Sequence, residues 1–200
     1  MNRARTSARR LLSEYVEAPV AGLLARLGIS PNAVTVAGLV GSGVSGYLVA
    51  TGNLWAGGVV MLAAGLLDLF DGALARATGR ASKFGALLDS VVDRLSEIVV
   101  LLGLLVFYLA NSSSSGVILV YLAVTGSVMV SYLRARSEGL GIESRGGIMT
   151  RPERVALMGV GLIVASWVQV FMLLVLGLIA ALALVTTGQR LYHAWRTLRD

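Results

Sequence analysis

Long apolar stretches dominate this chain and restrict it to a membrane fold. Hydrophobic residues make up 56% of the 200-residue sequence, and the mean hydropathy is +0.79. Runs of about 18 or more apolar residues recur, and a helix of that length crosses the hydrocarbon core of a bilayer. A soluble domain needs more polar surface than this composition supplies. The sequence therefore predicts an all-α integral membrane protein.

Six transmembrane helices are predicted, because turn residues divide the apolar sequence. Four of them cover about 31–50, 54–77, 82–109 and 117–134. The fifth starts near Pro152, and the last apolar run, 155–188, is split near 167–169 into the fifth and sixth spans. Ser30 and Pro31 are typical of a capped helix start, and Pro152 is a second first-turn proline. Gly38, Ser42 and Gly46 are four residues apart, which favours the close approach of another helix.

The N-terminal segment has a different pattern. Residues 3–28 combine arginines with apolar residues that recur at helical spacing on one side. We expect an amphipathic juxtamembrane helix that lies on the membrane surface. The predicted organisation is therefore an interfacial helix over 1–29, followed by a membrane domain of six helices over 30–200.

The basic residues are distributed unevenly. All 17 lysines and arginines lie before residue 31 or within 76–94, 134–154 and 190–199. Cytoplasmic loops of membrane proteins are enriched in such residues. We therefore expect a multi-pass protein of the cell membrane, with both termini and the 76–94 segment on the cytoplasmic side. Basic loops beside anionic lipid headgroups also account for the net charge of +6, so no nucleic-acid partner is expected.

Four aspartates interrupt the apolar pattern. Asp68 and Asp71 are three residues apart and Asp89 and Asp93 are four apart, so each pair shares one face of a helix. Gly79, between the pairs, predicts a turn. The result is a helical hairpin with two acidic pairs near its turn. Crowded carboxylates repel one another, and Mg²⁺ or Mn²⁺ suits such all-oxygen ligands.

These aspartates belong to a longer motif, D-x2-D-G-x2-A-R-x8-G-x3-D-x3-D. Eight residues occupy its fixed positions: Asp68, Asp71, Gly72, Ala75, Arg76, Gly85, Asp89 and Asp93. The motif resembles the signature of the CDP-alcohol phosphotransferases, integral membrane enzymes of phospholipid synthesis. The resemblance covers about residues 30–195 and leaves the N-terminal helix outside.

The resemblance implies a role for each part of the motif. The four aspartates would hold two divalent ions, Mg²⁺ or else Mn²⁺, and Asp93 would also be the general base for the acceptor hydroxyl. Gly72 would let the nucleotide approach the backbone, and Arg76 would contact the diphosphate. The remaining residues of the CDP-lipid site would be Pro31, Asn32, Ala33, Val34, Asp68, Ser82 and Gly85. For Gly85, helix packing opposite Gly72 stays an equal alternative.

The acceptor is predicted from the 134–154 segment. Its R-A-R-S-E-G-L-G and R-P-E-R pieces are similar to the subgroup that makes phosphatidylinositol phosphate or its archaeal ether-lipid counterpart. Inositol phosphate is a dianion and requires a basic pocket. Arg134, Arg154 and Arg190 lie at the ends of three different predicted spans and are the candidates for it. Membrane anchoring is the alternative for each, and the second candidates are Arg136, Arg145 and Arg151.

The expected reaction is transfer of a phosphatidyl group from CDP-diacylglycerol to inositol phosphate, giving phosphatidylinositol phosphate and CMP. A phosphatidylglycerol phosphate synthase, or a relative with another acceptor, is the first alternative. A cation transporter that uses the aspartates as an ion path is a remote one, because the four carboxylates gather at one end of the predicted spans. The resemblance also implies a homodimer.

Overall fold

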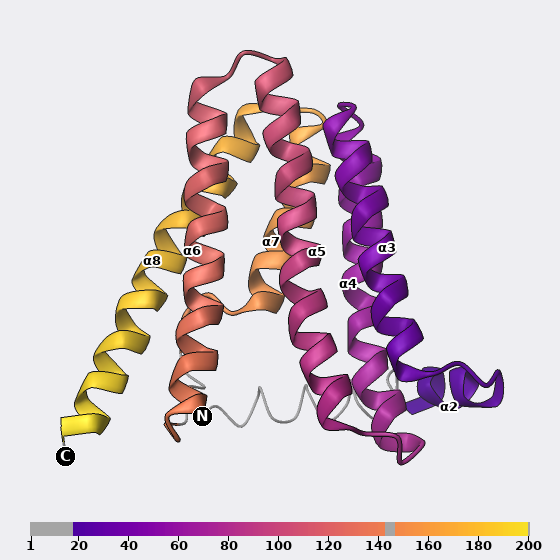
Figure 1. Ribbon diagram of the computed structural model, residues 1–200. Coiled ribbons are helices and arrows are strands. Elements are labelled where there is room, and N and C mark those ends of the chain that lie inside the picture. The colour runs from indigo at the N-terminus through magenta and orange to yellow at the C-terminus, as the bar shows by residue number, and fades with distance from the viewer. Residues whose placement is uncertain (1–17, 143–146, 200) are drawn as a thin grey trace. The chain divides into compact units, whose positions relative to one another are not determined.

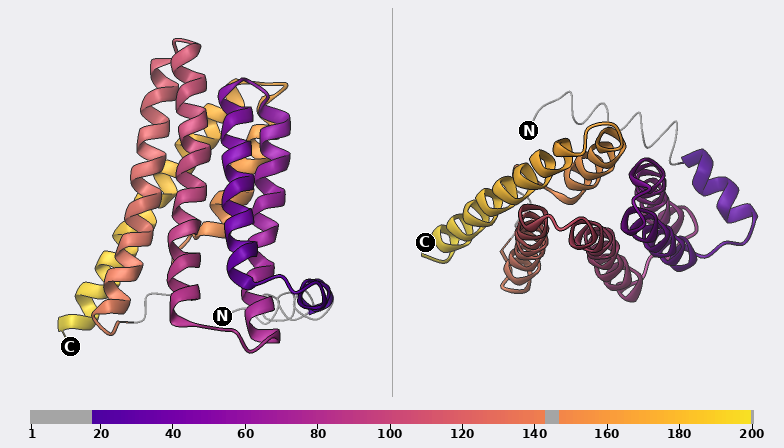
Figure 2. Two further views of the ribbon diagram at one scale, coloured as in Figure 1. Left: turned by 45° about the vertical axis from the view of Figure 1, so that its right-hand side comes forward. Right: turned by 90° about the horizontal axis from the view of Figure 1, so that it is seen from above.

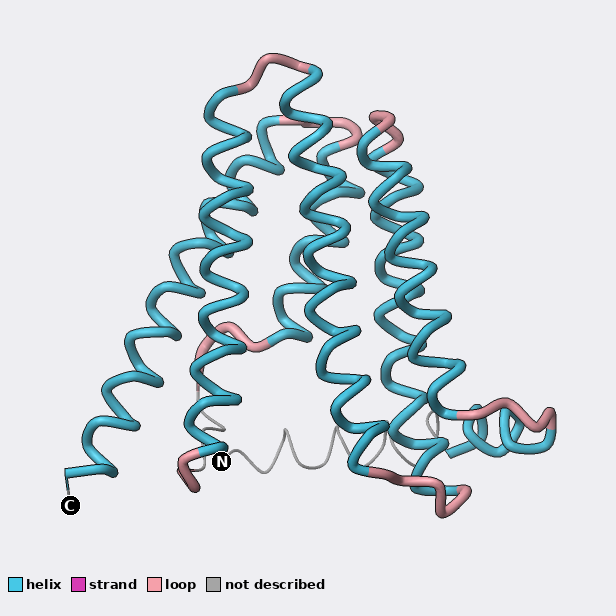
Figure 3. The backbone as a smooth tube through the Cα atoms, in the orientation of Figure 1, coloured by secondary structure: helices cyan, strands magenta, loops and turns pink. Residues whose placement is uncertain are grey.

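The structure, a computed structural model, describes residues 18–142 and 147–199. Within these residues all regular secondary structure is helical (Figures 1 and 3). The helices follow one another as α2 (Ala18–Arg26), α3 (Pro31–Ala50), α4 (Leu54–Ala77), α5 (Lys83–Ala110), α6 (Ser114–Gly139), α7 (Arg151–Ala165) and α8 (Val170–Arg199). The part of the predicted N-terminal helix before residue 18 lies outside the described residues.

Local signals fix several helix ends where the sequence predicted them. The Oγ atom of Ser30 accepts a hydrogen bond of 3.2 Å from the Ala33 amide, and Pro31 is the first residue of α3. Pro152 lies in the first turn of α7. The last apolar run divides between Ala165 and Val170, as predicted, and Trp167 in this break is exposed.

Membrane insertion is supported by four helices that are long and apolar enough to cross a bilayer: α3, α4, α6 and α8. Only 33–39% of the most apolar window of each is buried inside the protein, so most of these residues are exposed or only half-buried. The other two predicted spans do not reach this standard. α7 has 15 residues, and five charged residues lie in α5 between its start and Glu97: Lys83, Asp89, Asp93, Arg94 and Glu97.

The chain falls into two compact units. The first comprises residues up to Gly43 together with Ala63–Glu97. In it, α2 lies crosswise to the N-terminal part of α3 (Figures 1 and 2). Ala21 of α2 packs with Val34 of α3 and Leu74 of α4 in a small apolar cluster. This cluster holds the start of α3 beside the end of α4, where the predicted acidic motif lies.

The second unit comprises Val44–Leu62 and the chain from Ile98 onward. Its core is a large apolar cluster centred on residues such as Leu104, Met158 and Leu176, which are fully buried. Glycine permits the closest helix contact: a Cβ atom on Gly46 would lie 2.7 Å from the Val99 carbonyl oxygen. The predicted small-residue face of α3 therefore does bring helices together.

Candidate active site

A cavity of about 210 Å³ opens in the first unit, where α3 and α5 begin and α4 ends. Each of these three helices contributes lining residues, and so does the turn between α4 and α5. The lining residues are Pro31, Asn32, Thr35, Asp71, Gly72, Ala75, Arg76, Arg80, Ala81, Ser82, Gly85, Ala86 and Asp89. The cavity therefore contains most of the sequence motif, in a space that a small polar ligand can enter.

Two helix N-termini face this cavity. The first turn of α3 contributes Pro31 and Asn32, and the first turn of α5 contributes Gly85. Ser82 caps α5, because its Oγ atom accepts a hydrogen bond of 3.0 Å from the Gly85 amide. A helix N-terminus carries partial positive charge and unpaired N–H groups, so it attracts phosphate. Together with Arg76, the cavity is suited to an anionic ligand.

Three aspartates converge at the cavity. Asp68 and Asp71 of α4 and Asp89 of α5 each offer a carboxylate oxygen, and these oxygens all lie within 4.8 Å of one another. Asp71 is buried, whereas Asp68 and Asp89 are half-buried. Two carboxylates at this separation repel each other by about 3 kcal/mol at an effective dielectric constant of about 20. A cation between them offsets that repulsion.

This donor set fits a hard divalent cation. All three ligands are carboxylate oxygens, which suit Mg²⁺ and Mn²⁺ rather than softer metals. Oxygens on opposite sides of an octahedral Mg²⁺ are about 4.2 Å apart, given metal–oxygen distances of about 2.1 Å. The observed spread therefore needs only a small inward movement to surround one ion.

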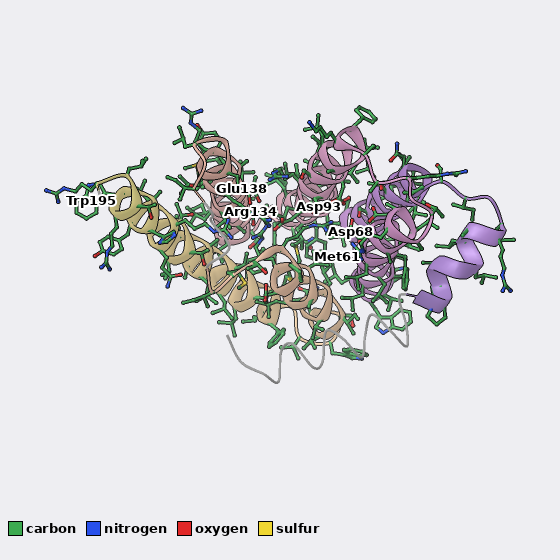
Figure 4. The ribbon with its side chains drawn as sticks, turned by 90° about the horizontal axis from the view of Figure 1, so that it is seen from below. Met61, Asp68, Asp93, Arg134, Glu138 and Trp195 are labelled. Atoms are coloured by element: carbon green, nitrogen blue, oxygen red, sulfur yellow. The ribbon has the colours of Figure 1, made fainter. Side chains whose placement is uncertain are left out.

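Asp93 is one helical turn beyond Asp89 on α5 and is half-buried. It lies outside the group of three. Figure 4 shows Asp68 on α4 and Asp93 on α5 in one view along the helices. Asp93 thus continues the acidic face of α5 beyond the three converging carboxylates. Glu97, one further turn along, is also buried, and we did not single it out from the sequence.

Thr35 is a site residue that sequence reasoning missed. Its side chain is buried, and its hydroxyl donates a hydrogen bond of 2.6 Å to Oδ2 of Asp71. The same hydroxyl lies 3.1 Å from the Pro31 carbonyl oxygen. A polar residue one turn after the helix-starting proline was the available signal. Because Thr35 holds one oxygen of Asp71, it orients the carboxylate toward the other two aspartates.

The predicted CDP-lipid residues separate into two groups. Those lining the cavity are Pro31, Asn32, Gly72, Arg76, Ser82 and Gly85, and Asp68 belongs to the carboxylate group. Ala33 and Val34 are not among the lining residues. The helical turn points Val34 to the other side of α3, where it is buried against α2 and α4. The assignment of Ala33 and Val34 to the CDP-lipid site therefore stays a prediction, with the Val34 side chain in the apolar cluster.

Gly85 and Arg80 both line the cavity. A Cβ atom on Gly85 would lie 3.2 Å from Ser82 Oγ and 3.4 Å from Asn32 Oδ1, so this glycine keeps the cavity open between α3 and α5. Arg80 is exposed and lines the same cavity, whereas Lys83, three residues later, does not line it.

A basic cluster forms in the second unit from α6, α7 and α8. Arg154 is 1% exposed and Arg190 is 6% exposed, which is rare for arginine and requires polar partners. Arg190 Nη1 donates a hydrogen bond of 2.6 Å to the Val130 carbonyl oxygen of α6. The charges of Arg134, Arg154 and Glu138 all act on the Arg190 guanidinium. The three predicted acceptor arginines are therefore neighbours.

Arg134 differs from the two buried arginines. Its side chain is 56% exposed, and its Nε atom lies 2.9 Å from Oε1 of Glu138 in an ion pair one turn along α6 (Figure 4). An exposed pair of this kind contributes little to stability, so a phosphate can compete for the guanidinium. Of the second candidates, Arg136 is exposed, Arg151 is half-buried, and Arg145 lies outside the described residues.

Comparison with known proteins identifies the class. The sequence matches the CDP-alcohol phosphatidyltransferase family over residues 28–188. A phosphatidylinositol phosphate synthase of Mycobacteroides abscessus is 36% identical over 184 residues, covering 90% of this chain and 83% of that protein. An archaetidylinositol phosphate synthase of Methanothermobacter thermautotrophicus is 33% identical, and the match covers 87% of each.

The fold is similar to that of a solved relative. The crystal structure of Mycobacterium tuberculosis phosphatidylinositol phosphate synthase with CDP-DAG bound has a TM-score of 0.82 and 33% identity, covering 90% of this chain and 94% of that one. A structure of the same protein in complex with manganese and citrate also has a TM-score of 0.82. By sequence and by fold, this chain belongs to the CDP-alcohol phosphatidyltransferase family. It is a transferase of phospholipid synthesis, as the motif predicted.

Proposed function

We propose that this protein transfers the phosphatidyl group of CDP-diacylglycerol to a hydroxyl of inositol phosphate, releasing CMP. The observation that carries this proposal is the convergence of Asp68, Asp71 and Asp89 at the cavity of a chain from this family. The relatives named for phosphatidylinositol phosphate and archaetidylinositol phosphate synthesis support the acceptor.

The CDP-lipid binds, in this proposal, with its diphosphate in the cavity of the first unit. The N-termini of α3 and α5 and the Arg76 guanidinium attract the phosphates. Gly72 and Gly85 leave room for the nucleotide beside the backbone. Two divalent ions, Mg²⁺ or Mn²⁺, held by the four aspartates would neutralise the diphosphate and stabilise the departing CMP. The manganese complex of the solved relative supports a divalent metal of this kind.

Asp93 accepts the proton of the acceptor hydroxyl. The hydroxyl oxygen then forms a bond to the lipid-linked phosphorus while the bond between that phosphorus and the CMP oxygen breaks. The proton remains on Asp93 until solvent removes it. Phosphoryl-type transfer depends mainly on positioning and charge stabilisation, so no protein nucleophile is required. This role agrees with the position of Asp93 on the acidic face of α5.

The acceptor phosphate is bound by Arg134, Arg154 and Arg190. Burial of the last two strengthens their attraction for a dianion, because water screens them less. Serine or ethanolamine acceptors carry no phosphate and would not need this cluster. Glycerol phosphate would, and a phosphatidylglycerol phosphate synthase is therefore the outcome that the acceptor test must distinguish.

The proposal includes a membrane topology and an assembly. We infer six spans in the cell membrane, with both termini and the aspartates on the cytoplasmic side, from the distribution of the 17 basic residues. Helix α2 lies at the cytoplasmic membrane surface. A homodimer is inferred from the family resemblance alone.

An acceptor panel tests the function. Purified protein in detergent micelles with CDP-diacylglycerol and Mg²⁺ is supplied with inositol phosphate, glycerol phosphate, inositol or serine, and CMP and the lipid product are measured. We expect CMP release with inositol phosphate, and we expect Asp93→Asn to abolish it while CDP-lipid binding is retained. Preference for glycerol phosphate would reassign the acceptor. Cation flux in liposomes without CMP release for any acceptor would refute the enzyme.

A further inference from the structure

The segment 147–149 lies unusually close to helix α8. Gly147 has a φ angle of +138°, in the region that favours glycine. A Cβ atom on it would lie 2.5 Å from Cγ2 of Thr186 and 3.5 Å from Nε of Arg190. Thr186 and Arg190 are one helical turn apart on α8, so this short segment rests on both of them.

Two hydrogen bonds of the Met149 backbone hold the segment in place. The Met149 amide donates a hydrogen bond of 3.1 Å to Oγ1 of Thr186, and the Met149 carbonyl oxygen accepts one of 3.4 Å from Nη1 of Arg154. Thr186 is 0% exposed, and its hydroxyl donates a hydrogen bond of 2.8 Å to the Leu182 carbonyl oxygen. A lone pair of Oγ1 therefore faces the Met149 amide.

The two buried arginines of the basic cluster are thus connected through one short piece of backbone. Arg154 of α7 donates to its carbonyl oxygen, and Arg190 of α8 packs against its glycine. Arg190 is also fixed from the other side by its bond to the Val130 carbonyl oxygen. A shift of the 147–149 segment would therefore move Arg154 relative to Arg190.

We propose that Thr186 is a positioning residue for the acceptor site, and that it acts through Met149 to set the spacing of the Arg154 and Arg190 guanidinium groups. This inference rests on the proposed function, in which those groups bind the phosphate monoester of the acceptor. Thr186 does not touch the acceptor. Its hydroxyl satisfies a buried amide that otherwise has to move to find a partner.

Three substitutions on α8 separate this role from packing. Thr186→Val keeps the shape and removes the hydroxyl, and Thr186→Ser keeps the hydroxyl and removes the methyl group. Thr187→Val is the matched control, since among the described residues the buried Thr187 hydroxyl has no hydrogen-bond partner. We expect Thr186→Val to raise the KM for inositol phosphate about tenfold, with the KM for CDP-diacylglycerol unchanged, as loss of one buried hydrogen bond predicts. Thr186→Ser and Thr187→Val should stay near the wild-type value.

Gly147→Ala perturbs the same segment without touching a hydroxyl, and it should raise the same KM. Arg154→Ala and Arg190→Ala establish whether the acceptor site itself is correctly placed. If both arginine variants raise the acceptor KM while Thr186→Val and Gly147→Ala do not, the positioning role is wrong and the proposed function stands. If Thr186→Val raises both KM values, or if Thr186→Ser raises the acceptor KM as much as Thr186→Val does, Thr186 serves packing alone. If neither arginine variant changes the acceptor KM, the acceptor site and this inference both fail.

Discussion

Single side chains around the aspartates decide how well the site is arranged before any ligand arrives. Asp71 is buried, and one of its oxygens accepts a hydrogen bond from the Thr35 hydroxyl. A ligating carboxylate that is oriented by a hydrogen bond loses less freedom when a metal binds. Thr35 therefore acts on the carboxylate group through Asp71.

Thr35→Val should weaken the binding of Mn²⁺ by about tenfold or more, because such outer hydrogen bonds contribute that much to metal affinity. The affinity is measured by titrating the purified protein with Mn²⁺ and following the free ion by electron paramagnetic resonance. Ser42→Ala is the control: Ser42 is buried on the same helix, and its hydroxyl bonds to the Gly38 carbonyl oxygen. Equal Mn²⁺ affinity for Thr35→Val and wild type would contradict the role.

Arg80 and Lys83 form a second matched pair. Both are exposed and basic, but only Arg80 lines the cavity. Arg80→Ala should raise the KM for CDP-diacylglycerol several-fold, since a charge near the diphosphate is lost. Lys83→Ala should change it little, and neither should alter the acceptor KM. Initial rates of CMP release at varied CDP-lipid concentration measure this difference. A similar effect of both substitutions would show that general basic charge, rather than a cavity contact, is responsible.

At the level of helices, the sequence predicted most of what local chemistry controls. Ser30, Pro31 and Pro152 mark helix starts through capping and fixed backbone angles, which act over one turn. The Thr35–Asp71 bond joins residues 36 apart, and the Arg190–Val130 bond joins residues 60 apart. Such contacts depend on which helices pack together, and hydrophobic periodicity does not contain that information.

The motif located the acidic site because its fixed spacing is typical of one kind of enzyme site. The direction in which the residues flanking the motif point was harder to predict. The resemblance placed Val34 in the ligand site, whereas its side chain packs in the apolar cluster of α2 and α4, and the motif did not indicate that Arg80 lines the cavity. A difference of one residue on a helix changes direction by about 100°. Residues flanking a motif therefore need the structure.

Helix packing at Gly46 gives an element-scale prediction. A Cβ atom at Gly46 would lie 2.7 Å from the Val99 backbone, while one at Gly43 on the same helix would have nothing within 4 Å. Gly46→Ala should destabilise the protein by about 1–3 kcal/mol through overpacking. Gly43→Ala should leave stability unchanged or raise it by up to about 1 kcal/mol, through helix propensity. Thermal unfolding in detergent compares the two, and a Gly46→Ala midpoint at or above that of Gly43→Ala would contradict the contact.

For the whole molecule, the open point is how many helices cross the bilayer. α7, with its 15 residues, is about 22 Å long, less than the roughly 30 Å of a hydrocarbon core. The apolar part of α5 begins only after Glu97. Both helices nevertheless lie between helices that are long enough to span. The basic residues all fall on one side of the membrane only if α5 and α7 each cross it as well.

The absence of cysteine from the sequence makes this directly testable. Four exposed positions near helix ends accept single substitutions: Lys83→Cys, Ser114→Cys, Ser166→Cys and His193→Cys. With six spans, a membrane-impermeant maleimide should label residues 114 and 166 in intact cells, and residues 83 and 193 only after permeabilisation. The cysteine-free protein is the control for background labelling. The reverse pattern would invert the topology. Residues 83 and 114 on the same side would remove α5 from the spans, because this pair flanks α5. Residues 114 and 166 on opposite sides would remove α7, because α6 and α7 lie between them and α6 alone would then cross.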